Sequence, residues 1–267
     1  MSVRVGLTLP SFVEDPDIPI AVARAAEDAG LDAVFVYDHL WRGNPPNRRP
    51  ALECVALLGA VAAETTRIRV GTLVARATLR PAATLANAFF TAQRVSSGRL
   101  IAGIGSGDSQ SRAENEAFGL PFGTMVDRVA ALHDAVRAAR EGDFPVWVGG
   151  HAAQVREIVP LADGWNGWGG DAERFGSDVA LVRELAPDAT MTWGGLTLTG
   201  ADDAAALAKA ETRSLDDDVL VGGPAHLAEQ LRRFVDRGAD WVILGPVDST
   251  NPDNAAPLGE VRVLLQR

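Results

Sequence analysis

The sequence predicts one α/β domain, a (β/α)8 (TIM) barrel spanning residues 1–267. Three observations lead to this fold class. Short apolar runs such as residues 100–104 lack polar alternation, as expected of parallel strands that are buried on both faces. These runs alternate with segments of helical spacing, which favours a parallel sheet with right-handed crossovers. Eight such units in 267 residues close most economically into a barrel.

The elements follow from hydrophobic spacing and from the residues that end each segment. Pro10 ends the first strand, Gly30 ends the first helix, and Pro81 begins the third helix. We expect strands at residues 3–9, 33–37, 68–74, 100–104, 146–148, 163–168, 190–198 and 241–245. We expect helices at residues 18–29, 51–64, 81–95, 124–140, 152–161, 173–185, 202–211, 224–237 and 258–265. The polar residues 109–123 are expected to form a loop.

The composition narrows the class of protein. No apolar run reaches the roughly 18 residues that a membrane span needs, and the net charge of −10 argues against nucleic-acid partners and acidic membrane surfaces. The single cysteine, Cys54, excludes an internal disulfide, and together with the absence of a leader sequence it predicts a cytoplasmic protein. Lys209 is the only lysine, which disfavours Schiff-base chemistry. The four histidines have no paired spacing, so no metal site is predicted.

Residues that follow the predicted strands are expected to surround one site, because barrel enzymes place their active sites at the carboxyl ends of the strands. The sequence Gly-Ser-Gly-Asp at residues 105–108 follows a buried strand, and its glycines let backbone N–H groups approach an anion. A plain strand-to-helix turn is the other interpretation of that segment. The remaining candidates at strand ends are Asp38, His39, Leu73, Val74, Arg76, Gly149 and Gly150.

A series of short motifs then resembles the luciferase-like monooxygenase superfamily, in its deazaflavin (coenzyme F420)-dependent branch. The motifs, in chain order, are AEDAGLDA at 26–33, DH at 38–39, GTLV at 71–74, SGRL at 97–100, GIGSG at 103–107, EAFG at 116–119, VWVGG at 146–150, ADGWN at 162–166 and VGGP at 221–224. Each motif is loose, but their order and spacing make the set specific.

The resemblance implies where a cofactor lies. The family holds it over the third strand at a bulge that often contains a non-proline cis peptide, which would here join Leu73 and Val74. Ser106 and Gly107 would line the cofactor's ring or side chain. Phosphate contacts carry over to Gly149, Gly150, Ala152 and Ala153, where helix N-terminal N–H groups favour an anion. Several rim arginines could also hold an anionic coenzyme: Arg42, Arg48, Arg49, Arg76, Arg80 and Arg112.

Two residues are candidate catalytic groups. In deazaflavin-dependent relatives, the histidine at the position of His39 acts beside the reactive ring carbon, and the pKa of an imidazole, about 6.5, suits proton exchange near neutrality. The alternative is that His39 only packs against the cofactor. Asp38 would accept a cofactor hydrogen bond, orient His39, or serve only as a turn residue. Asp108 occupies the position of an acidic residue assigned as a base in one sugar-phosphate dehydrogenase branch, although its shorter carboxylate weakens that transfer.

We therefore predict an enzyme that moves a hydride between coenzyme F420 and a small organic substrate. An FMN-dependent monooxygenase is the alternative within the same class. A sugar-phosphate lyase or isomerase barrel and a non-catalytic flavin-binding barrel are the alternatives from other classes. Family members are often dimers, so the resemblance implies a homodimer.

Overall fold

The computed structural model describes residues 2–43, 49–108 and 111–267, and eight parallel strands form a closed barrel. Around the barrel they are β1 (Arg4–Thr8), β2 (Ala33–Val36), β5 (Arg69–Arg76), β6 (Leu100–Gly105), β7 (Val146–Gly149), β8 (Gly164–Trp168), β9 (Thr190–Thr199) and β11 (Trp241–Pro246). The ring closes because β8 pairs with β9 and β11 pairs with both β9 and β1. The predicted (β/α)8 barrel is confirmed.

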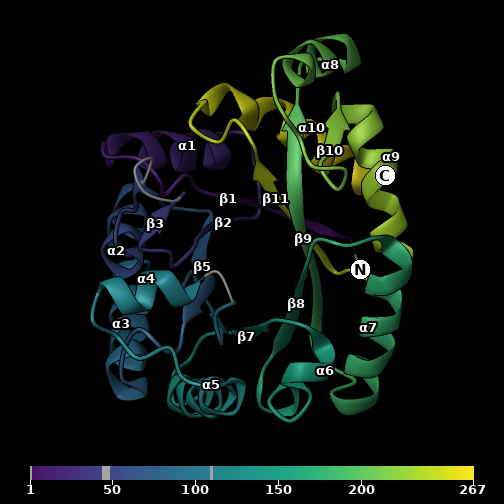
Figure 1. The fold of residues 1–267 in the computed structure, drawn as a ribbon. Coiled ribbons are helices and arrows are strands. Elements are labelled where there is room, and N and C mark those ends of the chain that lie inside the picture. Colours follow the sequence, from purple (N-terminus) through teal and green to yellow (C-terminus); the bar gives the residue numbers. More distant parts are fainter. Residues whose placement is uncertain (1, 44–48, 109–110) are drawn as a thin grey trace.

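The helices lie outside the strands (Figure 1). They are α1 (Asp17–Asp28), α2 (Cys54–Glu64), α3 (Ala82–Val95), α5 (Met125–Ala139), α6 (Ala152–Val155), α7 (Ala172–Leu185), α8 (Asp203–Glu211), α9 (Pro224–Val235) and α10 (Ala255–Leu265). Their apolar faces bury Leu58, Phe89, Leu132 and Leu231 against the outer surface of the strands. Cys54 belongs to this core, and burial raises the pKa of its thiol well above the usual value.

Large side chains fill the barrel interior. Phe35, Ile101, Trp147, Trp241 and Ile243 form a buried cluster inside the ring of strands. They fit because neighbouring strand positions are glycines: a Cβ on Gly6 would lie 2.8 Å from Ile243 and 2.9 Å from Phe35. This filled interior leaves space for a ligand only at an end of the barrel.

The structure corrects four details of the predicted elements. Residues Trp41–Arg42 (β3) and Arg49–Pro50 (β4) form an antiparallel pair, and Leu220–Gly222 (β10) adds a short strand beside the carboxyl end of β9. The loop expected at 109–123 contains a helix, α4 (Ser111–Ala117). The single helix expected at 152–161 is instead α6 followed by a 3-10 turn at Val159–Leu161.

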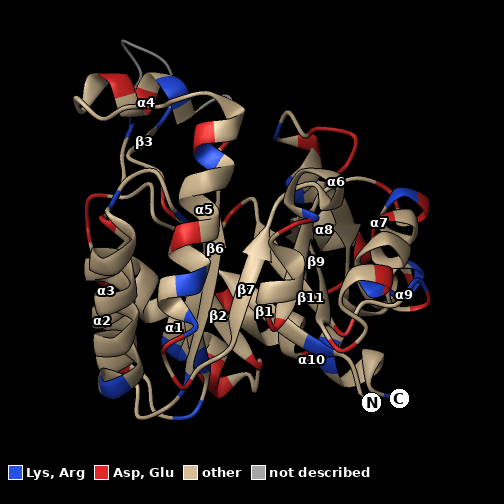
Figure 2. Cartoon of the chain, turned by 90° about the horizontal axis from the view of Figure 1, so that it is seen from below, with Lys and Arg blue, Asp and Glu red and all other residues tan. Residues whose placement is uncertain are grey.

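The two ends of the barrel differ in what they carry. In Figure 2 the helix α4 and strand β3 lie at one end, and both chain termini lie at the other. The charged residues gather on helices and loops, whereas the barrel strands are almost free of them. Within the described part of the chain, every helix is too short or too polar to cross a membrane.

Candidate active site

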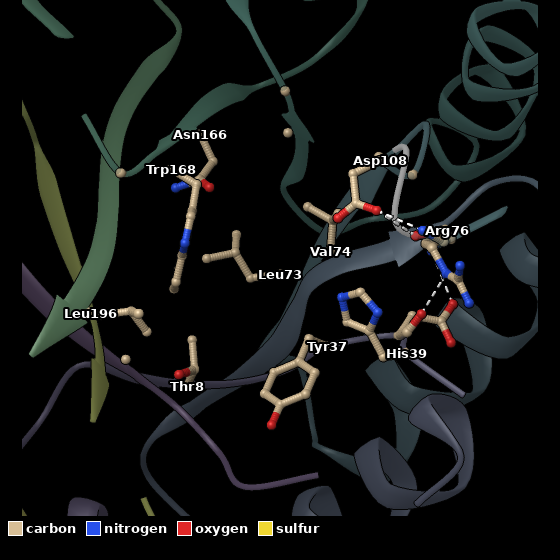
Figure 3. A pocket seen from close by; sticks show the side chains of 18 of the residues that line it. Thr8, Tyr37, His39, Leu73, Val74, Arg76, Asp108, Asn166, Trp168 and Leu196 are labelled. Atoms are coloured by element: carbon tan, nitrogen blue, oxygen red, sulfur yellow. Dashed lines mark hydrogen bonds between the residues drawn. The ribbon is translucent and has the colours of Figure 1, made fainter. Parts of the chain in front are cut away.

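A cavity of about 1320 Å³ opens at the carboxyl ends of the strands. His39, Val74, Gly107 and Gly149, which come from four different strand ends, all line it. Figure 3 shows their neighbours converging on the same space, with side chains from β1, β5, β8 and β9. The fold therefore brings together residues from distant parts of the sequence, since Thr8 and Leu196 both line the cavity.

One wall of the cavity is built around Val74. The peptide between Leu73 and Val74 is a non-proline cis bond, as the family resemblance implied, and the pairing of β5 with β6 is irregular between Thr72 and Ala75. The Val74 side chain occupies the space beside Gly105 and Gly149, where an added Cβ would lie 2.5 Å and 2.6 Å from its methyl groups. Glycine is thus required at the ends of β6 and β7. Backbone atoms of these two strands, together with the Val74 side chain, form this wall of the cavity.

His39 stands at the edge of the same space. Its Nδ1 lies 2.8 Å from Oε1 of Glu114 on α4, and its side chain remains 31% exposed. The ring packs near Phe12 and Tyr37, at centroid distances of 5.9 Å and 6.1 Å. Because an ionised carboxylate only accepts hydrogen bonds, Nδ1 donates to Glu114, and Nε2 is the ring nitrogen left to meet a ligand.

Glu114 is held by three groups of the protein. Besides His39, it accepts hydrogen bonds from the Leu40 backbone N–H at 2.7 Å and from the Arg76 guanidinium at 3.0 Å. Burial raises the pKa of this carboxyl, but the hydrogen bonds from His39 and Leu40 and the charge of Arg76 outweigh burial, so the pKa lies below its usual range. Glu114 is therefore ionised at neutral pH.

Arg76 and Asp38 form the support behind this pair. Arg76 donates Nε to the Asp38 carbonyl oxygen at 2.6 Å and Nη1 to Asn115 at 3.1 Å. The Asp38 carboxylate accepts hydrogen bonds from the Arg76 backbone N–H at 2.9 Å and from the Arg80 guanidinium at 2.6 Å. Asp38 and Arg76, both among the residues predicted to contact a cofactor, are thus bonded to protein groups, although both border the cavity.

Asp108 has a local partner. Its Oδ1 accepts hydrogen bonds from the Ser111 backbone N–H at 2.8 Å and from the Ser111 hydroxyl at 2.9 Å. Asp108 is thus bonded to the first residue of α4. Ser106, Gly107 and Asp108 all line the cavity, and Gly107 has a φ of +76°, which favours glycine.

The predicted phosphate contacts divide into two groups. Gly149 and Gly150 line the cavity, and Gly150 has a φ of +137°. Ala152 and Ala153 are the first two residues of the short helix α6, where Ala152 is buried and Ala153 is exposed. The neighbouring His151 lies 2.7 Å, Nδ1 to Nη2, from Arg174 of α7, and both border the cavity.

The opposite wall is largely apolar. In Figure 3 the Trp168 ring projects into the cavity between Leu196 and Leu73, with Thr8 below it. Trp168 lies against the backbone of β9, since a Cβ on Gly194 would lie 2.5 Å from its indole ring. This wall offers flat apolar surface, in contrast to the backbone-lined wall around Val74.

Sequence reasoning did not find Glu114. The signal available was the Glu116-Ala117-Phe118-Gly119 motif, which lies two residues beyond it. Of the predicted rim arginines, Arg80 binds Asp38 and Glu53, Arg112 lies 3.8 Å from Glu116, and Arg48 is outside the described residues. Among the described residues, no group of three or more His, Cys, Asp or Glu side chains is arranged to hold a metal ion.

The barrel interior is filled, and the cavity at the strand ends holds the ionisable pair His39–Glu114. This arrangement is typical of (β/α)8-barrel enzymes. Comparison with known proteins gives the family. The profile of the luciferase-like monooxygenase family matches residues 3–214, and the chain belongs to this family.

Two relatives illustrate the similarity at the sequence level. An F420-dependent glucose-6-phosphate dehydrogenase of Beutenbergia cavernae is 39% identical over 120 residues, which are 44% of this chain and 34% of that protein. An uncharacterised protein of Mycobacterium tuberculosis is 26% identical over 211 residues, 65% of this chain and 73% of its own. The matched segment thus covers about a third of the dehydrogenase.

Solved structures with the same fold include F420-dependent enzymes. An F420-dependent secondary alcohol dehydrogenase, solved with an F420-acetone adduct, superposes with a TM-score of 0.84 at 14% identity and covers 100% of both chains. The F420-dependent tetrahydromethanopterin reductase of Methanopyrus kandleri gives 0.78 at 15% identity, again over 100% of both chains. A monooxygenase of Streptomyces bottropensis gives 0.76 at 17% identity, over 99% of this chain and 98% of its own. At these identities the likeness establishes the fold.

Proposed function

We propose that this chain is an oxidoreductase that transfers a hydride between coenzyme F420 and a small organic substrate. One observation carries the proposal: His39, fixed through Nδ1 by Glu114, lines the same cavity as Val74 at the bulge of β5. The F420-dependent dehydrogenases that match 43–52% of this chain support the choice of coenzyme.

The residues present fit a large, flat, anionic coenzyme. A cavity of about 1320 Å³ exceeds the roughly 300–1,000 Å³ of common ligand pockets, so it has room for a coenzyme and a small substrate together. Val74 and the glycine backbone at Gly105 and Gly149 would carry the ring system. Gly149 and Gly150 would hold the phosphate, and Ser106 and Gly107 would line the ring or side chain. Ala152 and Ala153 would contribute only backbone N–H groups.

The bound coenzyme would supply the carbon that accepts or donates the hydride. The protein's own contribution is proton exchange at the substrate oxygen. When an alcohol is oxidised, Nε2 of His39 accepts the hydroxyl proton, and in the reverse reaction the imidazolium returns it. Glu114 stays ionised throughout and keeps the ring in one tautomer and one orientation. Asp38 and Arg76 position this pair and do not touch the reacting atoms.

An FMN-dependent monooxygenase is the second candidate. The family match and the superposition on a monooxygenase favour it. The two candidates differ in the anionic groups of the coenzyme: FMN has a phosphate, whereas F420 has a phosphate and an acidic glutamate tail.

Titration of the purified protein with oxidised F420 and with FMN tests the proposal. We expect F420 to bind more tightly, and we expect anaerobic turnover of a substrate panel to change the absorbance of F420. Tighter binding of FMN would reverse the cofactor assignment. If neither coenzyme binds, the proposal is wrong, and a barrel enzyme of another class, such as a sugar-phosphate lyase or isomerase, becomes the better interpretation.

A further inference from the structure

Arg128 is a buried arginine that lines the cavity without an acidic partner. It lies in the first turn of α5, and only 6% of the residue is exposed. Its Nη2 lies 3.5 Å from the sulfur of Met125, and its guanidinium carbon lies 4.2 Å from the centre of the Phe122 ring. Among the described residues its Nε has no hydrogen-bond partner, and none of the salt bridges includes it.

This arrangement costs free energy in the protein without a ligand. A buried charge without an opposite charge is unfavourable, and a cation in the first turn of a helix opposes the helix dipole. The other buried arginine of the described residues, Arg76, is bonded to Glu114 and Asn115. The half-buried Arg99 donates to four oxygen atoms of residues 62–68. Arg128 differs from these two arginines because its buried Nε has no partner among the described residues.

A second guanidinium reinforces the positive charge at this place. Arg112 of α4 lies 4.6 Å from the centre of the same Phe122 ring. Its carboxylate neighbour, Glu116, is 3.8 Å away, and both of those side chains are more than half exposed. Phe122 is thus flanked by two cations, of which the buried one borders the cavity.

We propose that Arg128 binds an anionic group, a carboxylate or a phosphate, of a ligand that occupies the cavity. Its planar fork suits either group. Two sources supply such an anion: the glutamate tail of the coenzyme, which rests on the proposed function, and the phosphate of a sugar-phosphate substrate. Because Gly149 and Gly150 are proposed to hold the coenzyme phosphate, the glutamate tail is the coenzyme anion left for Arg128.

Three variants isolate the charge. Arg128→Met keeps an apolar chain over Phe122 and removes the cation, Arg128→Lys keeps the cation, and Arg137→Met is the control on the exposed face of the same helix. Each is titrated with F420 and with the deazaflavin riboside that lacks the phosphate and the glutamate tail. We expect Arg128→Met to weaken F420 binding by about tenfold to a hundredfold. Riboside binding should stay unchanged, Arg128→Lys should recover part of the loss, and Arg137→Met should bind like the wild type.

A substrate arm distinguishes the two sources. If Arg128→Met leaves F420 binding unchanged but raises the KM for glucose 6-phosphate, the anion belongs to the substrate and the site stands. Equal weakening of F420 and of the riboside would overturn the proposal, because it would mean a general packing defect.

A readout without coenzyme separates this proposal from the proposed function. Inorganic phosphate at constant ionic strength should raise the melting temperature of the wild type more than that of Arg128→Met. Without phosphate, Arg128→Met should melt at or above the wild-type temperature, because it removes an unpaired buried charge. A clearly lower melting temperature, or an equal phosphate effect on both proteins, would overturn the anion site even if F420 binds. A wild type that binds no deazaflavin yet shows the phosphate effect would overturn the proposed function alone.

Discussion

Carboxylates occupy both ends of the barrel, but they bond to different partners there. At the amino-terminal end, Asp32, Asp163 and Asp240 each stand one residue before a strand. Their carboxylates accept the backbone N–H of the neighbouring strand, from Val5 at 2.9 Å, Val146 at 2.8 Å and Met191 at 2.8 Å respectively. Each aspartate also donates its own N–H to the carbonyl of that same residue. The same two-bond arrangement thus occurs three times.

At the carboxyl-terminal end, the carboxylates bind side chains of the site as well as backbone N–H groups. Asp38 binds Arg80 besides the Arg76 N–H, Glu114 binds His39 and Arg76 besides the Leu40 N–H, and Asp108 binds Ser111. The difference teaches that one chemical group stabilises the fold at one end and orients site residues at the other, as expected for (β/α)8 enzymes. Substitutions at the two ends should therefore separate activity from stability.

The largest expected effect is on activity, at His39. Under the proposed function, His39→Ala should reduce the single-turnover rate by about 10²–10⁴-fold, the usual contribution of a general acid or base. Coenzyme binding and the melting temperature should change little, since the ring is partly exposed. His133→Ala, on an exposed part of α5, is the control. An unchanged rate in His39→Ala would assign this histidine to packing.

Glu114→Gln should have the next largest effect. It keeps the side-chain size but removes the charge that fixes His39, so we expect a fall of about tenfold or more in turnover with a smaller change in coenzyme affinity. It also leaves the buried Arg76 without its charged partner, so the melting temperature should fall as well. If Glu114→Gln turns over as fast as the wild type at a temperature where both proteins are folded, Glu114 does not position His39 for catalysis.

Glu27→Gln tests the opposite end. The Glu27 carboxylate accepts backbone N–H groups from Thr66, Arg67 and Ile68 at 2.7–2.9 Å, and its pKa is lowered to about 2: burial raises it, but these hydrogen bonds outweigh burial. We expect a loss of about 1.5–3 kcal/mol of unfolding free energy at pH 7, with unchanged activity of the folded enzyme.

The pH dependence of that loss has a defined sign. Because the folded pKa lies below the unfolded value, the stabilisation is fully present above about pH 4.5 and is lost as the pH falls towards 2. Unfolding curves of wild type and Glu27→Gln should therefore converge in that range. The exposed neighbour substitution Asp28→Asn should change stability by less than about 0.5 kcal/mol. A constant difference across the pH range would contradict the assignment.

Asp108→Asn should have the smallest effect. The amide oxygen of asparagine can accept the same two hydrogen bonds from Ser111, so stability should be kept while the carboxylate charge is lost. If Asp108 only holds the start of α4, turnover should change less than about threefold, within the spread of ordinary surface substitutions. A loss of turnover comparable to that of His39→Ala would instead make Asp108 a catalytic base. The carboxyl-terminal end would then hold a second carboxylate that acts in catalysis.

The sequence allowed prediction of the barrel and of the strand ends that border the cavity. Apolar runs specify parallel strands, and strands of a closed barrel put their carboxyl ends together, so His39, Val74 and Gly107 could be placed near one another without coordinates. The cis bond at Leu73–Val74 was predictable only from the family resemblance, because dipeptide chemistry gives no local signal for it.

The partners within the site could not be predicted. Asp38 and His39 are adjacent, and consecutive side chains at a strand end point to different sides, so Asp38 faces Arg80 while His39 meets Glu114 from a distant helix. Residues 111–117 lack apolar periodicity, which hid α4 and with it Glu114. Arg76 reads in the sequence as a rim cation, but its side chain is 3% exposed and supports the site from behind.

The helix α4 links the site to the local stability of the chain. With seven residues it is far shorter than the roughly 12–15 that an isolated helix needs, so it stays folded through its contacts with the barrel. Glu114 and Asn115, both bonded to Arg76, are among those contacts. Any opening of α4 therefore withdraws Glu114 from His39. Under the proposed function, only molecules with α4 docked hold His39 in the orientation needed for proton exchange. Amide hydrogen exchange in residues 111–117 measures the fraction of molecules with α4 docked directly.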